Sequence, residues 1–380
     1  MSALYLHIPY CKSRCIYCDF YTTASTRGYS AFVQALCGEL VLRSKTWAKT
    51  EIQTIYVGGG TPSQLSIEEL AHIFKIIEAH YQISNTAEIT IEANPDDLTE
   101  AYVAAMRQHL PVNRISMGLQ TFDNQLLRLL NRRHTAEEAE MAVKRLMHYG
   151  YTNLSIDLIY GLPNQTLEAW QHDVARALCL PIKHLSAYAL IYEPGTPLMR
   201  MKAAGKVHEA DDALSLAMFE HLIDATQVAG LQQYEISNFA REGYHSRHNT
   251  TYWQGKPYVA CGPSAHGYDG MHRYYNTPRL ASYIKAMGDV EGQGLQHIEV
   301  LSIDEQYNDF VLTRLRTMAG LNTEELVAQF GTDYLDYALQ EAQTHLQRGH
   351  LEHIGNVLRL TRNGIFVSDT IMADLMRVDD

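Results

Sequence analysis

The sequence predicts an α/β protein, an open partial (βα)6 TIM-like barrel followed by a small winged-helix-like α+β domain. Three observations indicate this fold. In residues 4–193, short aliphatic or β-branched runs alternate with amphipathic stretches, the pattern of a parallel sheet whose strands are joined by helices. Polar or glycine-rich segments follow the ends of these runs, where βα barrels carry their active sites. Residues 301–380 show helical patterns followed by a hairpin.

Six strands form the predicted barrel. They are expected at residues 4–8, 52–57, 88–92, 114–117, 154–160 and 185–191, and each but the last is followed by a helical pattern. Capping boxes mark two helix starts, at Ser66 with Glu69 and at Thr135 with Glu138. Six units are too few to close an eight-stranded barrel, so we expect an open barrel with a lateral mouth. A doubly wound sheet is the competing topology.

Three cysteines follow the first predicted strand in a CxxxCxxC spacing, namely Cys11, Cys15 and Cys18. A [4Fe-4S] cube normally takes four cysteines, so three would leave one iron open to another ligand. A structural zinc site with His7 as its fourth ligand is the alternative. Disulfides are not expected, because the chain has only six cysteines in 380 residues and shows no signal peptide.

Further polar residues are expected at the ends of the next strands. Glycines let a ligand approach the backbone closely, carboxylates and amides can bond hydroxyl or amino groups, and an arginine can hold a carboxylate. Taken singly, a glycine-rich turn is more often only a tight turn, and an isolated Asp or Glu is more often a helix cap. Their common placement around one mouth favours a ligand site, made of Gly58, Gly59, Gly60, Thr61, Glu92, Asn94, Gln120, Arg132 and Asp157.

Six motifs together identify a family resemblance that covers nearly the whole chain. They are LYLHIPYCKSRCIYCDF, YVGGGTPSQLS, IEANPDD, ISMGLQTFD, LNRRH and IDLIYGLPNQT. The combination resembles the radical S-adenosylmethionine family, in the branch that contains oxygen-independent coproporphyrinogen III oxidase and the HemW-type heme chaperones. The resemblance implies a [4Fe-4S] cluster on Cys11, Cys15 and Cys18, with S-adenosylmethionine on the open iron. It also implies contacts to S-adenosylmethionine from Tyr5, Tyr17, Gly59, Gly60, Thr61, Glu92, Gln120, Arg132 and Asp157.

Two departures separate this chain from the oxidase. The oxidase motif resembles CxxxCxxCxC, with a further cysteine two places after the third. In this chain that position is occupied by Phe20. The oxidase also has an N-terminal extension that helps to enclose its tetrapyrrole, and only residues 1–3 precede the first strand in this chain. A decarboxylase that works through a radical must exclude water. These departures favour a heme chaperone that passes heme to acceptor proteins, with oxygen-independent coproporphyrinogen III oxidation in porphyrin metabolism as the alternative.

Aromatic and histidine side chains are dense in residues 234–275, and one string there resembles a heme-chaperone motif. The string HNTTYW resembles HNxxYW and implies heme contacts from His248, Tyr252 and Trp253, with His248 as the iron ligand. Histidine is a common axial ligand of heme, and flat rings pack against a macrocycle. The alternative is that these residues tie an irregular segment to the barrel through stacking and hydrogen bonds.

Three segments are expected: the barrel at 1–193, a connector with the heme-associated segment at 194–300, and the winged-helix-like domain at 301–380. Acidic residues outnumber basic ones in the last segment, and the whole chain carries a net charge of −12, so nucleic acid is not expected as a partner. No stretch approaches the length of a membrane span, and we expect a cytoplasmic protein. Expected partners are heme, heme-accepting proteins and an electron donor for the cluster. How much enzymatic chemistry remains is left open.

Overall fold

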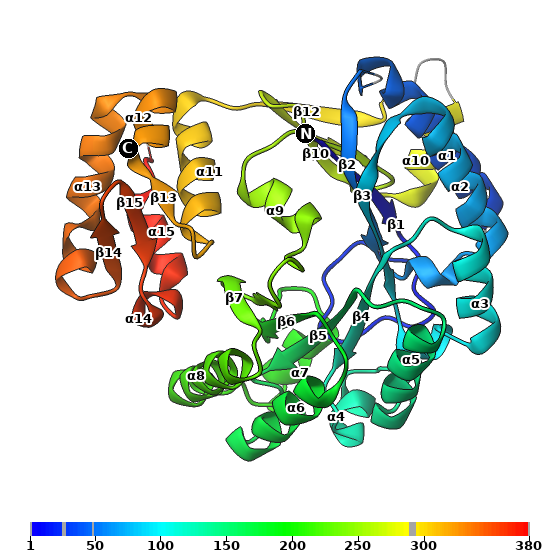
Figure 1. Ribbon diagram of the computed structural model, residues 1–380, viewed down its shortest axis with the longest axis horizontal. Helices are drawn as coiled ribbons and strands as arrows, with labels where there is room; N and C mark the ends of the chain where they lie inside the picture. The colour runs from blue at the N-terminus through cyan, green and yellow to red at the C-terminus, as the bar shows by residue number, and fades with distance from the viewer. Residues whose placement is uncertain (1, 25–27, 48, 289–293, 379–380) are drawn as a thin grey trace.

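The computed structural model describes residues 2–24, 28–47, 49–288 and 294–378. Within this part of the chain, one large curved sheet carries helices on its outer side, and a smaller domain lies beside it (Figure 1). The sheet has twelve described strands in the order β12-β11-β10-β9-β1-β2-β3-β4-β5-β6-β8-β7.

The first half of the chain forms the parallel centre of this sheet. Strands β1 to β6 pair with one another in chain order, and every pair is parallel. This confirms the predicted partial barrel and excludes a doubly wound order. Its elements are β1 (Ser2–Ile8), α1 (Tyr29–Trp47), β2 (Glu51–Gly59), η1 (Pro62–Gln64), α2 (Ile67–His80), β3 (Gln82–Ala93), η2 (Pro95–Asp97), α3 (Glu100–His109), β4 (Arg114–Gln120), α4 (Asn124–Leu129), α5 (Ala136–His148), β5 (Leu154–Tyr160), α6 (Leu167–Cys179) and β6 (His184–Ala189).

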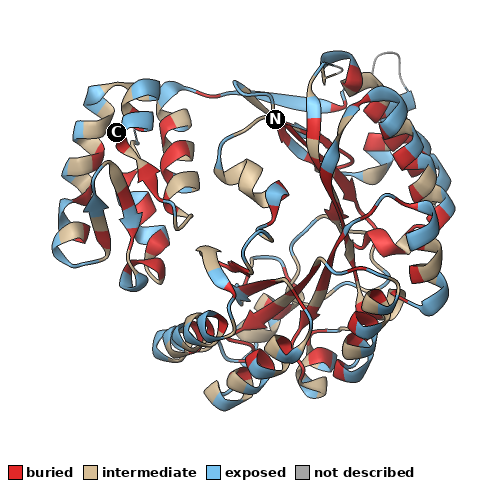
Figure 2. Cartoon of the chain, viewed as in Figure 1, coloured by how far each residue is buried: buried red, intermediate tan, exposed pale blue. Residues whose placement is uncertain are grey.

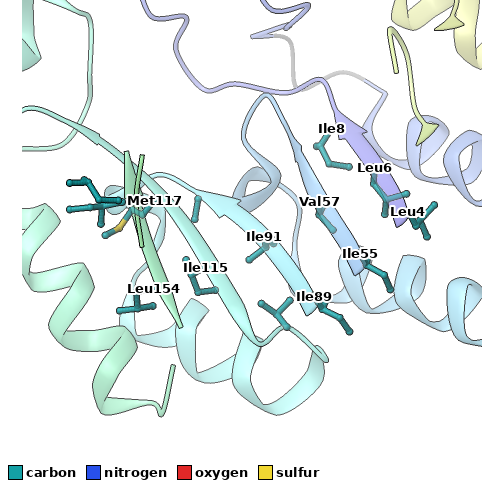
Figure 3. Close-up of a cluster of buried hydrophobic side chains, with 14 of the residues drawn as sticks. Leu4, Leu6, Ile8, Ile55, Val57, Ile89, Ile91, Ile115, Met117 and Leu154 are labelled. Carbon is teal, nitrogen blue, oxygen red and sulfur yellow. The ribbon is translucent and has the colours of Figure 1, made fainter. Parts of the chain in front are cut away.

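Local sequence explains where these elements begin and which face they bury. Both predicted capping boxes are present, with Ser66 and Thr135 accepting from the backbone N–H of Glu69 and Glu138. Alternate residues of a strand point to opposite faces of the sheet. The aliphatic residues on the helix-facing side of β1 to β5 therefore form a continuous core, which Figure 3 shows with Leu4, Leu6, Ile8, Ile55, Val57, Ile89, Ile91, Ile115, Met117 and Leu154.

Residues 194–300 contribute more to the sheet than the sequence patterns indicate. The elements of this segment are α7 (Pro197–Ala203), α8 (Asp212–Val228), β7 (Gln232–Glu235), β8 (Asn238–Ala240), α9 (Arg247–Trp253), β9 (Tyr258–Cys261), β10 (His266–Tyr268), β11 (His272–Asn276), α10 (Leu280–Gly288) and β12 (Gln296–Val300). Strands β8 and β7 extend the sheet beyond β6, and β9 to β12 extend it beyond β1. All five residues of the edge strand β12 are exposed (Figure 2).

The C-terminal domain is the predicted α+β unit with an antiparallel hairpin. It contains α11 (Ile303–Leu315), β13 (Leu321–Asn322), α12 (Thr323–Phe330), α13 (Thr332–Gln347), β14 (Leu351–Ile354), β15 (Val357–Leu360), α14 (Arg362–Ile365) and α15 (Ser368–Leu375). Its three strands are antiparallel in the order β13-β15-β14. The predicted hairpin is formed by β14 and β15, whereas β13, α14 and α15 were not expected.

This domain contacts both ends of the curved sheet. At one end, Glu235 of β7 forms an antiparallel bridge with Thr317, and its buried carboxylate pairs with Arg316 at 3.1 Å. At the other end, β12 leads into α11, and Arg273 of β11 forms an ion pair with Asp309 of α11. The C-terminal domain therefore bridges the open side of the barrel (Figure 1). No helix in the described ranges combines the length and apolar character needed to cross a membrane.

Candidate functional site

A cavity of about 500 Å³ opens at the carboxyl ends of the parallel strands. Its wall includes all three motif cysteines and nearly every residue that the family resemblance assigns to S-adenosylmethionine. These wall residues are Cys11, Cys15, Cys18, Tyr17, Gly59, Gly60, Thr61, Glu92, Gln120, Arg132 and Asp157. Of the residues assigned to that cofactor, Tyr5 does not line the cavity; its hydroxyl is hydrogen-bonded to His7 instead.

The glycine loop after β2 holds the cysteine loop through backbone hydrogen bonds. Gly60 N–H donates to the carbonyl of Ile8 at 2.7 Å, and Thr61 N–H donates to the carbonyl of Tyr10 at 2.7 Å. A Cβ atom on Gly60 would lie 2.7 Å from the Tyr10 carbonyl oxygen, closer than any side chain tolerates. Gly59 has a φ of 104°, which favours glycine. The close approach of the two loops therefore requires glycine at position 60, and the backbone conformation favours it at position 59.

All three cysteines are free and partly exposed toward the cavity. The hydroxyl of Thr61 donates to the Cys11 sulfur at 3.5 Å, and Arg132 Nη1 donates to the Cys15 sulfur at 3.4 Å. Burial raises the pKa of the Cys18 thiol to about 11 and also raises the pKa of Cys11. Binding to a metal centre deprotonates thiols, so cluster assembly here must release protons.

The zinc alternative does not fit this arrangement. The imidazole of His7 is buried, with Nδ1 hydrogen-bonded to the Tyr5 hydroxyl at 3.0 Å and Nε2 to the Tyr21 carbonyl at 3.3 Å. Neither nitrogen is free to serve as a fourth ligand. In the described ranges, no three His, Cys, Asp or Glu side chains are grouped as a site for a single metal ion. An iron–sulfur cube is larger than one ion and takes thiolates that stand further apart.

Two half-buried carboxyl groups line the cavity, Glu92 on β3 and Asp157 on β5, with β4 between these strands. Glu92 accepts from the Tyr56 hydroxyl at 2.7 Å and from Gly59 N–H at 3.1 Å. Burial raises the pKa of Glu92 to about 7, although the Tyr56 hydrogen bond favours the ionised form. Burial likewise raises the pKa of Asp157 to about 6, although a hydrogen bond with the hydroxyl of Ser186 favours the ionised form. A cationic ligand in this cavity would ionise both groups and be attracted by them.

Arg132 offers an unused donor inside the site. Its Nη2 donates to Asn94 Oδ1 at 2.8 Å and to the Gly118 carbonyl at 2.5 Å, while its buried Nε has no partner among the residues that the structure describes. A buried donor without a partner is costly, and a ligand carboxylate would satisfy it. Nearby, Gln120 has a φ of 73°, a strained conformation for a residue with a side chain and one that is concentrated at functional sites.

Asp97 joins three of the sequence motifs and was not singled out from the sequence. It accepts hydrogen bonds from Ser63 Oγ at 2.9 Å and from Gln64 Nε2 at 2.7 Å, both in η1, directly after the glycine loop. It also forms an ion pair with Arg133 at 3.0 Å. Arg133 follows Arg132 directly, so this network positions the arginine of the cavity. The IEANPDD and LNRRH strings contain these residues, and only their proximity in the fold shows the contact.

The HNTTYW string lies within α9, and none of its residues lines the cavity. His248 is 1 % exposed, and its Nδ1 and Nε2 are hydrogen-bonded to the hydroxyls of Thr54 and Tyr252, each at 2.8 Å. Its ring lies 5.0 Å from that of Tyr56 and 6.3 Å from that of Tyr5. Heme ligation by His248 stays a prediction, and in this conformation both ring nitrogens are already bonded.

Trp253, at the end of the same helix, contacts the C-terminal domain. Arg314 donates to the Trp253 carbonyl at 2.5 Å, and the guanidinium of Arg316 lies 4.9 Å from the centre of the indole ring. The contacts of His248 and Trp253 match the structural alternative for this string, in which it ties neighbouring parts of the protein together. Contacts of Tyr252 and Trp253 with heme likewise stay predictions.

Comparisons with known proteins agree with this fold and site. Residues 5–177 match the Radical SAM superfamily, and residues 301–367 match the HemN C-terminal domain. The solved structure of coproporphyrinogen III oxidase (HemN) from Escherichia coli superposes with a TM-score of 0.85 at 23% identity, over 98% of this chain and 89% of that one. At this identity the match supports the fold. The fold and the cysteine loop thus define a radical S-adenosylmethionine protein.

Sequence relatives identify the family within that class. The heme chaperone HemW of Bacillus subtilis is 31% identical over 374 residues, which cover 98% of each chain. HemW of Escherichia coli is 33% identical over 371 residues, covering 95% of this chain and 94% of the relative. HemW of Mycobacterium tuberculosis is 33% identical over 378 residues, covering 98% and 94%. This chain belongs to the HemW family, as the sequence motifs predict.

Proposed function

We propose that this protein is a heme chaperone that carries a [4Fe-4S] cluster and S-adenosylmethionine, binds heme and transfers it to acceptor proteins. The relatives named as heme chaperones support the role. The observation that carries the cofactor part is the one cavity wall on which the three free thiols, the carboxyl groups of Glu92 and Asp157, and Arg132 meet. A cytoplasmic location, an electron donor and heme-accepting partners belong to the proposal and follow from the family resemblance.

The cavity residues have separate roles in this proposal. Cys11, Cys15 and Cys18 hold the cluster, which when bound supplies one electron to the sulfonium of S-adenosylmethionine. Arg132 gives its unpartnered Nε to the carboxylate of that cofactor. The half-buried carboxylate of Glu92 is held by Tyr56 and Gly59 in position to accept from an amino or hydroxyl group.

The residue at the oxidase's further cysteine position supports the chaperone over the oxidase. Phe20 lies on the cavity wall with 62% of its surface exposed, and its side chain offers no ligand to a metal. Ile191, also on the wall, is 64% exposed. At these two positions the cavity wall therefore presents apolar side chains.

The test begins with anaerobic reconstitution of the purified protein with iron and sulfide. We expect a bound [4Fe-4S] cluster whose EPR spectrum changes when S-adenosylmethionine is added. Added heme should give a Soret band, and the loaded protein should pass heme to a heme-free hemoprotein. The triple variant with Cys11, Cys15 and Cys18 changed to Ala should lose the cluster, whereas Cys179→Ala, at an exposed cysteine outside the site, should keep it.

Two results would contradict the proposal. One is a wild-type protein that binds no heme under conditions in which its cluster is assembled. The other is sustained formation of protoporphyrinogen from coproporphyrinogen III, which would make the protein an oxidase.

A further inference from the structure

Three aromatic side chains stack across the antiparallel strands at one end of the sheet. His266 of β10 pairs with Tyr275 of β11, and Tyr275 pairs with His297 of β12. The first two ring centres are 5.4 Å apart with 25° between the planes, and the second two are 4.9 Å apart with 20°. The rings follow the spacing of neighbouring strands, ~4.8 Å, so the backbone sets the stack. We call these three residues the ring stack.

The ring stack is exposed and its histidines are unbonded. His266 and His297 are exposed, and 39% of Tyr275 is accessible. Among the described residues, no hydrogen bond reaches either imidazole, whereas both nitrogens of the buried His248 are bonded. Partial burial and the charge of Arg273 lower the pKa of His266, which keeps its imidazole neutral. A neutral, unbonded imidazole has a lone pair available for a metal.

The opposite face of the same strands is fixed to the core. Tyr274 is buried, its hydroxyl accepts from the backbone N–H of Ala260 at 2.8 Å, and the guanidinium of Arg43 lies 4.2 Å from its ring centre. Asn276 is buried and donates to Glu39 at 2.8 Å. Because alternate residues point to opposite faces, these anchors hold β11 while the ring stack faces outward. The stack is therefore a pre-positioned surface.

The ring stack adjoins the cofactor loops. Strand β9 lies between β10 and β1 in the sheet, and β1 carries His7. His7 in turn packs against the glycine loop, since a Cβ on Gly59 would lie 2.5 Å from its Nδ1. A molecule on the stack would thus lie beside the loops that form the cofactor cavity.

We propose that heme docks on the ring stack, with His266 as an axial ligand of the iron and with Tyr275 and His297 in contact with the porphyrin. An axial imidazole stands perpendicular to the plane of the macrocycle. Because the rings of Tyr275 and His297 are nearly parallel to that of His266, they would meet the face of the porphyrin with their edges. Edge-to-face contact is a favoured arrangement of aromatic groups. This inference rests on the proposed function, because it names where a heme chaperone would hold its heme.

The test is a heme titration of the full-length protein, followed by the Soret band and by EPR of the ferric iron. His266→Ala should weaken heme binding about tenfold or more and alter the spin state, as expected for loss of a central contact. His297→Ala and Tyr275→Leu should weaken binding less. The matched control is His272→Ala, since His272 is also partly exposed on β11 but is bonded to Asp269. The affinity of the His272→Ala variant for heme should differ from that of the wild type by less than about twofold.

Metal-free protoporphyrin separates iron ligation from ring contact. Binding of this probe should weaken in Tyr275→Leu and change little in His266→Ala. Circular dichroism checks folding, and His266→Gln replaces His266→Ala if the latter does not fold. If the variant with both His266→Ala and His297→Ala bound heme with wild-type affinity, the inference would be overturned and the proposed function would still stand. No heme binding by the wild-type protein would overturn both.

Discussion

Replacing His248 with alanine should destabilise the protein strongly, because this imidazole is part of the barrel core. The change leaves the hydroxyls of Thr54 and Tyr252 without a buried partner, and it opens a cavity against the rings of Tyr5 and Tyr56. An unsatisfied buried polar group costs ~1–3 kcal/mol, and lost packing adds to it. We therefore expect the free energy of unfolding to fall by about 3–5 kcal/mol.

The same side chain predicts a dependence on pH with a definite sign. Burial lowers the pKa of His248 from its ordinary value of 6.5 to about 3, with a further contribution from Arg114. Below pH 6.5 the unfolded chain binds a proton at His248 that the folded chain does not, so stability is lost as the pH falls from 6.5 toward 3. At pH 5 this loss amounts to about 2 kcal/mol, and the His248→Ala variant lacks it.

Urea unfolding at pH 7 and pH 5, followed by circular dichroism, measures both effects. The matched control is His353→Ala, an exposed histidine on β14, which should change the free energy of unfolding by less than ~0.5 kcal/mol. The difference in the free energy of unfolding between the wild type and His248→Ala should be smaller at pH 5 than at pH 7. If His248→Ala behaved like the control at both pH values and yet lost the Soret band of added heme, the structural reasoning would be refuted and the ligand assignment supported.

Three further predictions concern the cavity. Gly60→Ala places a Cβ against carbonyl oxygens of the cysteine loop and should cost about 1–3 kcal/mol of stability and lower the iron content after reconstitution. Affinity for S-adenosylmethionine, measured by calorimetry, should rise from pH 6 to pH 8, because Glu92 and Asp157, with pKa values of about 7 and 6, ionise beside the cationic groups of that cofactor and release protons when it binds. Glu92→Gln should flatten this dependence of affinity on pH. An affinity that falls as the pH rises would contradict the assignment. Asp97→Ala should leave Ser63 and Gln64 without their shared acceptor and Arg133 with Asp96 as its remaining ion-pair partner, and it should lower the unfolding free energy by about 1–3 kcal/mol in urea titrations. An unchanged midpoint would show that this network is dispensable.

The parallel part of the barrel could be predicted because its strands carry a strong local pattern. Strand β5 begins and ends where the sequence indicates, and both capping boxes form. The strands of residues 232–300 could not be predicted, because β8 and β10 have three residues each, too few for an alternating pattern. Their place in the sheet depends on pairing with strands that are distant in the chain.

The candidate site was predictable where it follows from topology. The carboxyl ends of parallel strands meet at one face, so residues such as Cys15 and Arg132 come together although 117 positions separate them. The position of His248 was not predictable in the same way. Its partner Thr54 lies 194 positions earlier, and no local pattern shows that α9 places its histidine against that strand. A motif gives residue types, but the hydrogen bonds of those residues depend on the tertiary fold.

The bridge made by the C-terminal domain has a consequence for the order in which the protein can be completed during synthesis. The buried carboxylate of Glu235 meets its guanidinium only when Arg316 has left the ribosome, and the ion pair of Arg273 waits for Asp309. Contacts between such distant positions form late and slow folding. A nascent chain that ends before residue 300 would therefore have a barrel with two unjoined edges, which makes this stage of synthesis the one most exposed to mispairing with other chains.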